Sequence, residues 1–194
     1  MKHVIAIALI VLIAGTAIAE VKQPDTQEAT MVNASKIVIT GELDASSPTW
    51  NRGWGNHDVS LECAYPLTDS SQDGQSYAVF AIMSNDDQPI EIIVDENATV
   101  LGDTWMGLYC ADFDAADPLT NAVFVDDDGG VGLYSAIALA DNVVLPAGEQ
   151  FWLVLSTYGP GDFGDFTINT SNNVELFAVA NTIANWDMVK GMYR

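Results

Sequence analysis

The sequence predicts an all-β fold, an antiparallel, jelly-roll-like β-sandwich of about nine strands with one disulfide. Three observations support this prediction. Apolar residues recur at every second position in several short stretches, and a period of two is the signature of a β-strand. Clusters of Gly, Pro, Asn, Asp and Ser separate these stretches, as in sandwiches and barrels. The chain has 194 residues, of which 49% are hydrophobic, so it can bury the core of one domain.

The expected strands follow one another from residue 37 onwards. Residues 37–39 and 151–155 are apolar at successive positions, which is typical of strands in the centre of a sandwich. Elsewhere the apolar residues alternate, so one face of each strand is expected to be buried and the other wet. The alternating sets are Val59 to Leu67, Tyr77 to Met83, Ile90 to Val94 and Trp105 to Tyr109. A further apolar strand precedes Asp126.

Residues 1–19 are predicted to be a secretory signal peptide. Lys2 gives a positive start, an apolar run extends from Val4 to Ile13, and Ala17-Ile18-Ala19 is a small-x-small cleavage site. A transmembrane anchor is the alternative, but the run is short for a span of about 20 residues. We therefore expect a mature protein that is secreted, extracellular or periplasmic, with no membrane insertion after signal cleavage.

The rest of the chain is expected to divide into a flexible N-terminal tail (20–34), the β-sandwich domain (35–172) and a C-terminal extension (173–194). In the extension, apolar residues at spacings of three and four fit one face of an amphipathic helix, while 174–179 also fits a last strand. We expect a strand followed by a short helix. The apolar face of this helix either covers the domain's own core or docks onto a partner or another copy.

Cys63 and Cys110 are the only cysteines, and export favours a disulfide between them. Free thiols or half of a metal site are the alternatives. His57 is the single histidine after the signal peptide, which argues against a zinc site. The bridge would bring two segments that are distant in sequence together, and in the chain-entropy model it is worth roughly 4 kcal/mol.

Negative charge dominates the chain: 27 acidic residues against 6 Lys and Arg residues give a formal net charge of -21. This balance argues strongly against nucleic-acid binding, which requires cationic side chains. Residues 53–189 contain no Lys or Arg, so the carboxylates of this stretch cannot pair with bases inside it. Screening by salt or a bound divalent cation would reduce the resulting repulsion.

Calcium is the predicted cofactor, because carboxylate oxygens on loops are the ligands that Ca²⁺ takes. The candidate ligands are Asp103, Asp112, Asp114, Asp126, Asp127 and Asp128. Asp162 and Asp165 lie in a further Gly-rich loop. The spacing is not that of an EF-hand. A solvated acidic turn is the alternative for each cluster.

A glycan is the other candidate ligand. Residues 50–57 combine two Trp residues with polar side chains in a Gly-rich loop, and aromatic faces can stack on sugars. The candidate ligand-binding residues are Trp50, Arg52, Trp54 and His57. No Gly-x-Ser-x-Gly motif is present, and no pair of carboxylates stands out as acid and base, so we expect no enzyme.

Several segments resemble one known family. Gly41–Arg52 resembles the opening of bacterial extracellular jelly-roll domains of the pre-peptidase C-terminal type, which also recur in adhesins. Later segments that are similar to this family are Tyr77–Phe80, Asp103–Tyr109, Phe113–Asn121, Asp126–Asp128 and Leu145–Val154. The resemblance spans roughly 36–169. It implies a non-catalytic β-sandwich that serves as an accessory, adhesive or surface module.

These features together predict a secreted, calcium-stabilised, non-catalytic protein of cell-surface or matrix adhesion and assembly. A carbohydrate-binding module and an accessory domain protein of a secreted hydrolase system are the alternatives. The expected partners are other copies of this chain or surface glycans.

Overall fold

The computed structural model describes residues 36–55, 63–69, 73–110 and 113–176. In this part of the chain every strand pairs with its neighbours in the antiparallel sense, as predicted. In chain order the strands are β1 (Val38–Leu43), β2 (Thr49–Trp50), β3 (Gly53–Trp54), β4 (Thr68–Asp69), β5 (Gln75–Ser84), β6 (Ile92–Val94), β7 (Thr104–Tyr109), β8 (Ala122–Asp126), β9 (Ala136–Ile137), β10 (Gln150–Thr157), β11 (Gly164–Thr170) and β12 (Val174–Leu176). A 3-10 turn, η1 (Leu139–Asp141), precedes β10. The described residues contain no helix long and apolar enough to cross a membrane. The predicted C-terminal helix lies outside the described residues.

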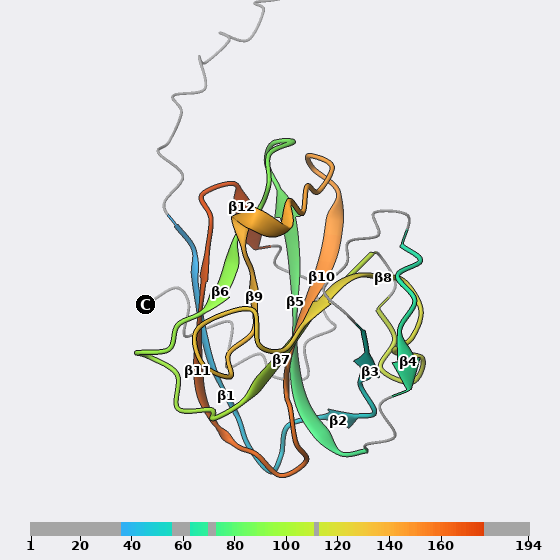
Figure 1. Cartoon of the computed structure of the whole chain (residues 1–194), viewed down its shortest axis with the longest axis vertical. Coiled ribbons are helices and arrows are strands. Elements are labelled where there is room, and N and C mark those ends of the chain that lie inside the picture. Colours follow the sequence, from blue (N-terminus) through green and yellow to red (C-terminus); the bar gives the residue numbers. More distant parts are fainter. Residues whose placement is uncertain (1–35, 56–62, 70–72, 111–112, 177–194) are drawn as a thin grey trace, which may run out of the picture. The chain divides into compact units, whose positions relative to one another are not determined.

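The strand order is that of a jelly roll (Figure 1). One sheet has the order β1-β11-β6-β9, and the other has the order β12-β5-β10-β7-β8. Apart from β12, the strands of the two sheets pair from the outside inwards along the sequence: β1 pairs with β11, β5 with β10, β6 with β9, and β7 with β8. The chain is therefore one long hairpin folded over into two sheets, and β11–β6 and β10–β7 are the pairs that the folding adds. With β12 this makes nine strands, as predicted, besides the short strands β2, β3 and β4 of the β1–β5 connection.

The main core lies between the two sheets. It contains buried side chains from both of them, such as Ile39 and Ile168 of one sheet and Phe80 and Leu153 of the other. Leu153 lies on β10, which pairs with β5 on one side and β7 on the other. The run 151–155 is therefore a central strand, as its continuous apolar character predicts.

A second core covers the outer face of the β5–β10–β7–β8 sheet. Trp50 and Tyr65, which both lie between β1 and β5, pack there against Trp105 and Tyr109 of β7. All six residues of β7 are consequently buried. The prediction that one face of each alternating strand is wet is wrong for β7, because the long β1–β5 connection folds back over the sheet and replaces water.

Two further expectations are corrected by the structure. Residues 37–39 were expected in a central strand, but β1 is an edge strand, so Val38 is 48% exposed while Ile39 is buried. Residues 59–67 were expected in a strand. Among them only 63–67 are described, and these form no regular strand but an irregular segment joined to the sheet, with Tyr65 N donating to Ala122 O at 3.0 Å.

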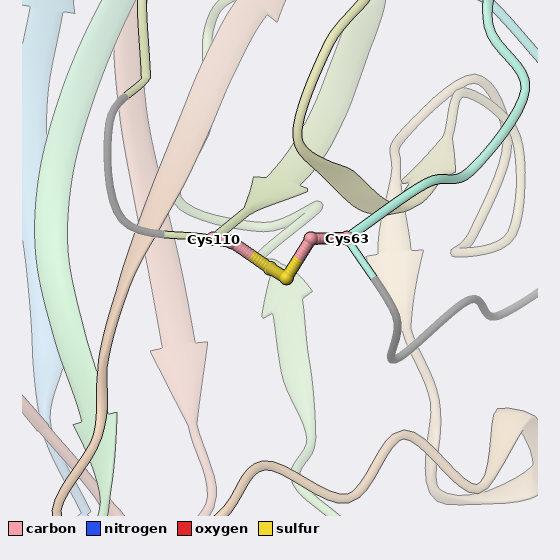
Figure 2. Close-up of a disulfide and its surroundings, with 2 residues drawn as sticks. All are labelled: Cys63 and Cys110. Atoms are coloured by element: carbon pink, nitrogen blue, oxygen red, sulfur yellow. A yellow bond between two sulfur atoms is a disulfide. The ribbon is translucent and has the colours of Figure 1, made fainter.

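The predicted disulfide is present and ties the β1–β5 connection to the sheet. Figure 2 shows the bridge between Cys63 and Cys110, whose Cα atoms lie 5.8 Å apart across 47 positions of sequence. Cys110 directly follows β7, and its backbone N–H donates to Asn121 O at 2.9 Å. The bridge thus holds the β1–β5 connection close to the C-terminal end of β7, the strand on which this connection packs.

Four connections meet at one end of the jelly roll. Leu43 at the end of β1 pairs with Gly164 at the start of β11, and Thr157 at the end of β10 pairs with Thr104 at the start of β7. By the antiparallel pairing of β6 with β11 and of β8 with β7, the turns that follow β6 and β8 emerge at this end. We call the surface formed by residues 52–54, 99–103, 127–134 and 158–163 the loop end.

Candidate functional site

The candidate site is built at the loop end around Arg52, which lies between β2 and β3. Gly53 follows it and allows the backbone to approach the second core closely, because a Cβ atom there would lie 2.7 Å from Leu67 Cδ1. The β3–β4 pair, in which Trp54 lies opposite Thr68, then returns the chain along the same face. This path places the Arg52 side chain inside the protein and the Trp54 ring at its surface.

The guanidinium of Arg52 is enclosed by three aromatic rings. It lies 4.6 Å from the ring centroid of Tyr158, 5.3 Å from that of Trp54 and 5.7 Å from that of Trp105. Arg52 is only 1% exposed, and its Nη2 donates to Tyr158 O at 3.4 Å. Among the described residues, Nε and Nη1 have no hydrogen-bond partner. Cation–π attraction to the rings therefore provides much of what holds this buried charge.

Carboxylates gather next to this cation. Asp103 is half-buried, and its Oδ1 is enclosed without a hydrogen-bond partner in the described part of the chain. Burial, together with the charges of Asp128, Asp127 and Asp162, raises the pKa of Asp103 to about 6, although Arg52 acts in the opposite direction. Burial lowers the pKa of Arg52, and Asp127 and Asp103 are among the groups that oppose this effect. Asp103 is thus a carboxylate whose negative charge is poorly compensated.

The predicted calcium ligands separate into three groups. Asp103, Asp127 and Asp128 lie near one another, together with Asp162 of the Gly-rich loop. Asp126 is instead a structural residue, 2% exposed, whose Oδ2 accepts hydrogen bonds from Gly129 N and Ala136 N, both at 2.8 Å.

Asp114 belongs to a different surface. It lies in the loop that follows β7, its Oδ1 accepts from Ala116 N at 2.8 Å, and its charge acts on Tyr77 rather than on Asp103. Asp112 lies outside the described residues. In the described ranges, no group of three or more His, Cys, Asp or Glu side chains is arranged closely enough to hold a metal ion.

The predicted glycan residues also separate. Trp50 is 4% exposed and belongs to the second core, so its ring cannot stack on a ligand at the surface, and the sequence-based assignment of Trp50 to a binding loop is corrected. Trp54 is 39% exposed, and its ring meets that of Tyr158 edge-on at 6.1 Å. His57 lies outside the described residues.

The two sites that the sequence suggested separately therefore lie together. Arg52 and Trp54 come from the expected glycan loop, and Asp103, Asp127 and Asp128 come from the expected calcium loops, yet all of them meet at the loop end. Sequence reasoning did not assign Tyr158 or Trp105 to the site. The position of Tyr158 directly before Gly159-Pro160, at the end of a central strand, was the available signal for the former.

This arrangement can bind in two ways. The carboxylates attract a cation but could coordinate it together only by moving closer than they lie here, and the half-exposed Trp54 ring beside Tyr158 can take a flat or apolar group. Comparison with known proteins finds no matching family model, no matching curated relative and no matching solved structure.

Proposed function

We propose that this chain is a secreted, non-catalytic β-sandwich protein that acts in adhesion or assembly at the cell surface or in the extracellular matrix, and that calcium stabilises it. The observation that carries the calcium part is the setting of Asp103. The negative charges of three other carboxylates raise the pKa of Asp103, and in the described part of the chain Arg52 is the cation that lowers it. Lys36, the other described base, acts on Asp95 instead.

A divalent cation would relieve this repulsion more effectively than Arg52 does. Arg52 is held against aromatic rings rather than against the carboxylates. Calcium tolerates flexible geometry and six to eight oxygen ligands, so loop carboxylates and water can share it. Binding would draw the carboxylates of Asp127, Asp128 and Asp162 towards Asp103 and link three connections of the loop end.

The test is thermal unfolding with calcium and with a chelator at fixed ionic strength. One site at 100-fold excess over its dissociation constant adds roughly 2.7 kcal/mol, which corresponds to a Tm increase of about 5–10 °C for a domain of this size. Asp103→Asn should abolish most of this response. Asp114→Asn is the matched control, because Asp114 lies outside the cluster, and it should retain the full response. Identical melts with calcium and with the chelator would remove calcium from the proposal.

The adhesive part of the proposal rests on the fold and on the resemblance of residues 36–169 to extracellular jelly-roll domains. Jelly rolls serve as lectin domains among many other roles, so this support is by analogy. Four loops that meet at one end of a rigid sandwich are a common way to present a binding surface.

Carbohydrate binding is the second candidate, and the exposure of Trp54 favours it. The underlying Arg52 and the edge of Tyr158 hold this ring in place, and an immobilised ring loses little entropy when it stacks on a sugar. In a pull-down with insoluble polysaccharides, Trp54→Ala should abolish binding and Trp54→Phe should retain part of it. Equal binding by the wild type and Trp54→Ala would exclude this surface as the glycan site.

A further inference from the structure

The loop end exposes an unusual concentration of apolar side chains. Seven large hydrophobic residues are exposed in the described part of the chain, and five of them lie there. They are Trp54 (39% exposed), Val100 (71%), Val131 (62%), Leu133 (53%) and Phe163 (47%). Each of the four connections contributes at least one of them. Grouped exposure of this kind marks an interaction surface, whereas single exposed apolar residues need no explanation.

The same surface is rich in carboxylates. Asp103, Asp127, Asp128 and Asp162 lie among these apolar residues, and Arg52 below them is buried. A partner that is apolar and positively charged would therefore complement the loop end, whereas an acidic partner would be repelled.

The surface is preformed, because backbone hydrogen bonds join its loops. Val100 N donates to Asp165 O at 2.8 Å, and Tyr158 N donates to Asp103 O at 3.3 Å, which links the β6–β7 and β10–β11 connections. Thr104 N donates to Leu133 O at 3.1 Å and links the β8–β9 connection to them. Little loop ordering then opposes binding.

We propose that the loop end is a docking surface for residues 186–194 of the same chain. This segment contains Trp186, Met188, Val189, Met192 and Tyr193. It also carries Lys190 and Arg194, with Asp187 as its one acidic residue. Lys190 and Arg194 are the only Lys and Arg residues that follow Arg52 in the sequence, so this segment combines positive charge with apolar side chains as the surface requires.

The direction and length of the chain allow this contact. β12 runs antiparallel to β5, and β5 begins at the loop end, so β12 runs towards the loop end. Leu176 pairs with Ile82, seven residues from the start of β5 at Gln75, which is about 23 Å along a strand. Fourteen residues connect Leu176 to Lys190. Even if ten of them are helical and four are extended, they span about 28 Å, which exceeds the distance to the loop end. A tether this short gives an effective concentration in the millimolar range, which favours the same chain over a second copy.

Docking goes beyond the proposed function, because it makes the C-terminal segment a competitor for whatever else binds at the loop end. Calcium and polysaccharide binding are measured separately, so either can fail without affecting this inference.

Zero-length carbodiimide cross-linking, mapped by mass spectrometry, tests the proposal on the full chain after the predicted signal peptide. The only lysines after residue 19 are Lys22, Lys36 and Lys190, which makes the products few. We expect Lys190 to be joined to Asp127, Asp128 or Asp162. In a 1:1 mixture of ¹⁴N- and ¹⁵N-labelled protein, each cross-linked pair should carry one label only. Mixed pairs would show exchange between copies, and the absence of loop-end products, or their spread over all acidic residues, would equally overturn the proposal.

Two pairs of variants test the charged and the apolar contacts separately. Asp128→Lys should lower the yield of the Lys190 products with Asp127 and Asp162 by about two- to fivefold, while Glu149→Lys, on an exposed turn after η1, should leave it unchanged. Phe163→Ser should lower the yield, while Leu139→Ser, at an exposed apolar residue of η1, should not. Equal yields within either pair would contradict docking at the loop end. A melting temperature of each variant no lower than that of the wild type confirms that the fold is intact.

Discussion

The indole N–H of Trp50 donates a hydrogen bond to Ser156 Oγ at 2.9 Å, although 106 positions separate the two residues in sequence. Ser156 Oγ in turn donates to Ser76 O at 3.0 Å. Both residues are buried, Trp50 at 4% exposure and Ser156 at 0%. This pair fixes the segment that carries Arg52 and Trp54 to the central strand β10, so the candidate site depends on a buried polar contact in the second core.

Ser156→Ala should destabilise the protein by about 1–3 kcal/mol. The substitution leaves the Trp50 N–H buried without an acceptor, and that costs more than the hydrogen bond itself contributes. The measurement is chemical unfolding followed by tryptophan fluorescence. Thr68→Ala, which removes an exposed hydroxyl that donates to Trp54 O, is the control and should change stability by less than about 0.5 kcal/mol. Equal effects of the two variants would show that the buried contact contributes nothing.

Replacing both cysteines by serine should lower stability by roughly 4 kcal/mol, the value for a closed loop of this length in the chain-entropy model. The Tm should fall by about 8–16 °C. Reduction of the wild type should produce the same decrease, because the constraint and not the sulfur atoms supplies the stability. A Tm that stays within a degree after verified reduction would contradict this role of the bridge.

The strands of the jelly roll could be predicted because their apolar pattern is local. β10 is apolar on both faces and apolar residues recur at positions 90, 92 and 94 around β6, so these strands are identified from their own residues, whereas β9 and β11 were not among the expected strands. The disulfide could be predicted because the sequence has only two cysteines, which leaves one pairing, and the expected export favours a bridge.

The faces of the strands could not be predicted in the same way. Ala78, Phe80 and Ile82 line the core between the sheets, whereas Tyr77 and Val79 pack against the second core. Both sets are apolar, and only the path of the β1–β5 connection decides what covers the outer set. The sequence shows that this connection is long but not where it folds.

The residues of the site could be predicted but their proximity could not, because it too depends on how distant segments fold together. Carboxylates on turns and a Trp-rich loop are visible in the sequence, but their meeting depends on the register of β10 with β7, which places Thr157 opposite Thr104. Trp50 was misjudged because burial of its ring depends on Trp105 and Tyr109, which lie more than 50 positions away.

Asp103 should make stability fall as the pH rises from about 4 to about 6. Its pKa in the folded protein is raised to about 6, above the unfolded value of about 3.9, so the folded state binds more protons in this window. Protonation of Asp103 therefore stabilises the fold at the acidic end, and this contribution is lost as the pH rises through its folded pKa. Because the side chain is partly solvated, we expect a difference on the order of 1 kcal/mol.

Asp103→Asn should remove this dependence and raise stability at pH 7.5. Chemical unfolding at pH 4.5 and 7.5 without calcium measures both effects. Glu149→Gln, at an exposed acid outside the cluster, is the control and should preserve the pH dependence. A pH profile of Asp103→Asn that coincides with the wild-type profile would mean that the carboxylate titrates normally.

Gly107→Ala should destabilise the protein by about 1–3 kcal/mol through overpacking. Gly107 lies in the middle of β7, and a Cβ atom there would lie 2.5 Å from Trp105 Cη2 and 2.8 Å from Tyr109 Cε2. Both rings are buried and also contact Trp50, at centroid distances of 5.4 and 6.5 Å, so they cannot move aside freely. Without this clash, alanine would be favoured over glycine in a strand.

Gly102→Ala is the matched control for this substitution, because no atom lies within 4 Å of the added methyl group. It should leave stability unchanged or raise it slightly by restricting the unfolded chain. Chemical unfolding compares the two variants, and near-UV circular dichroism shows whether the packing of the rings changes in Gly107→Ala. Equal stabilities would mean that the second core adapts to an added methyl group. Trp50 would then lack the rigid support that positions Arg52 and Trp54, and the preformed character of the site would fail with it.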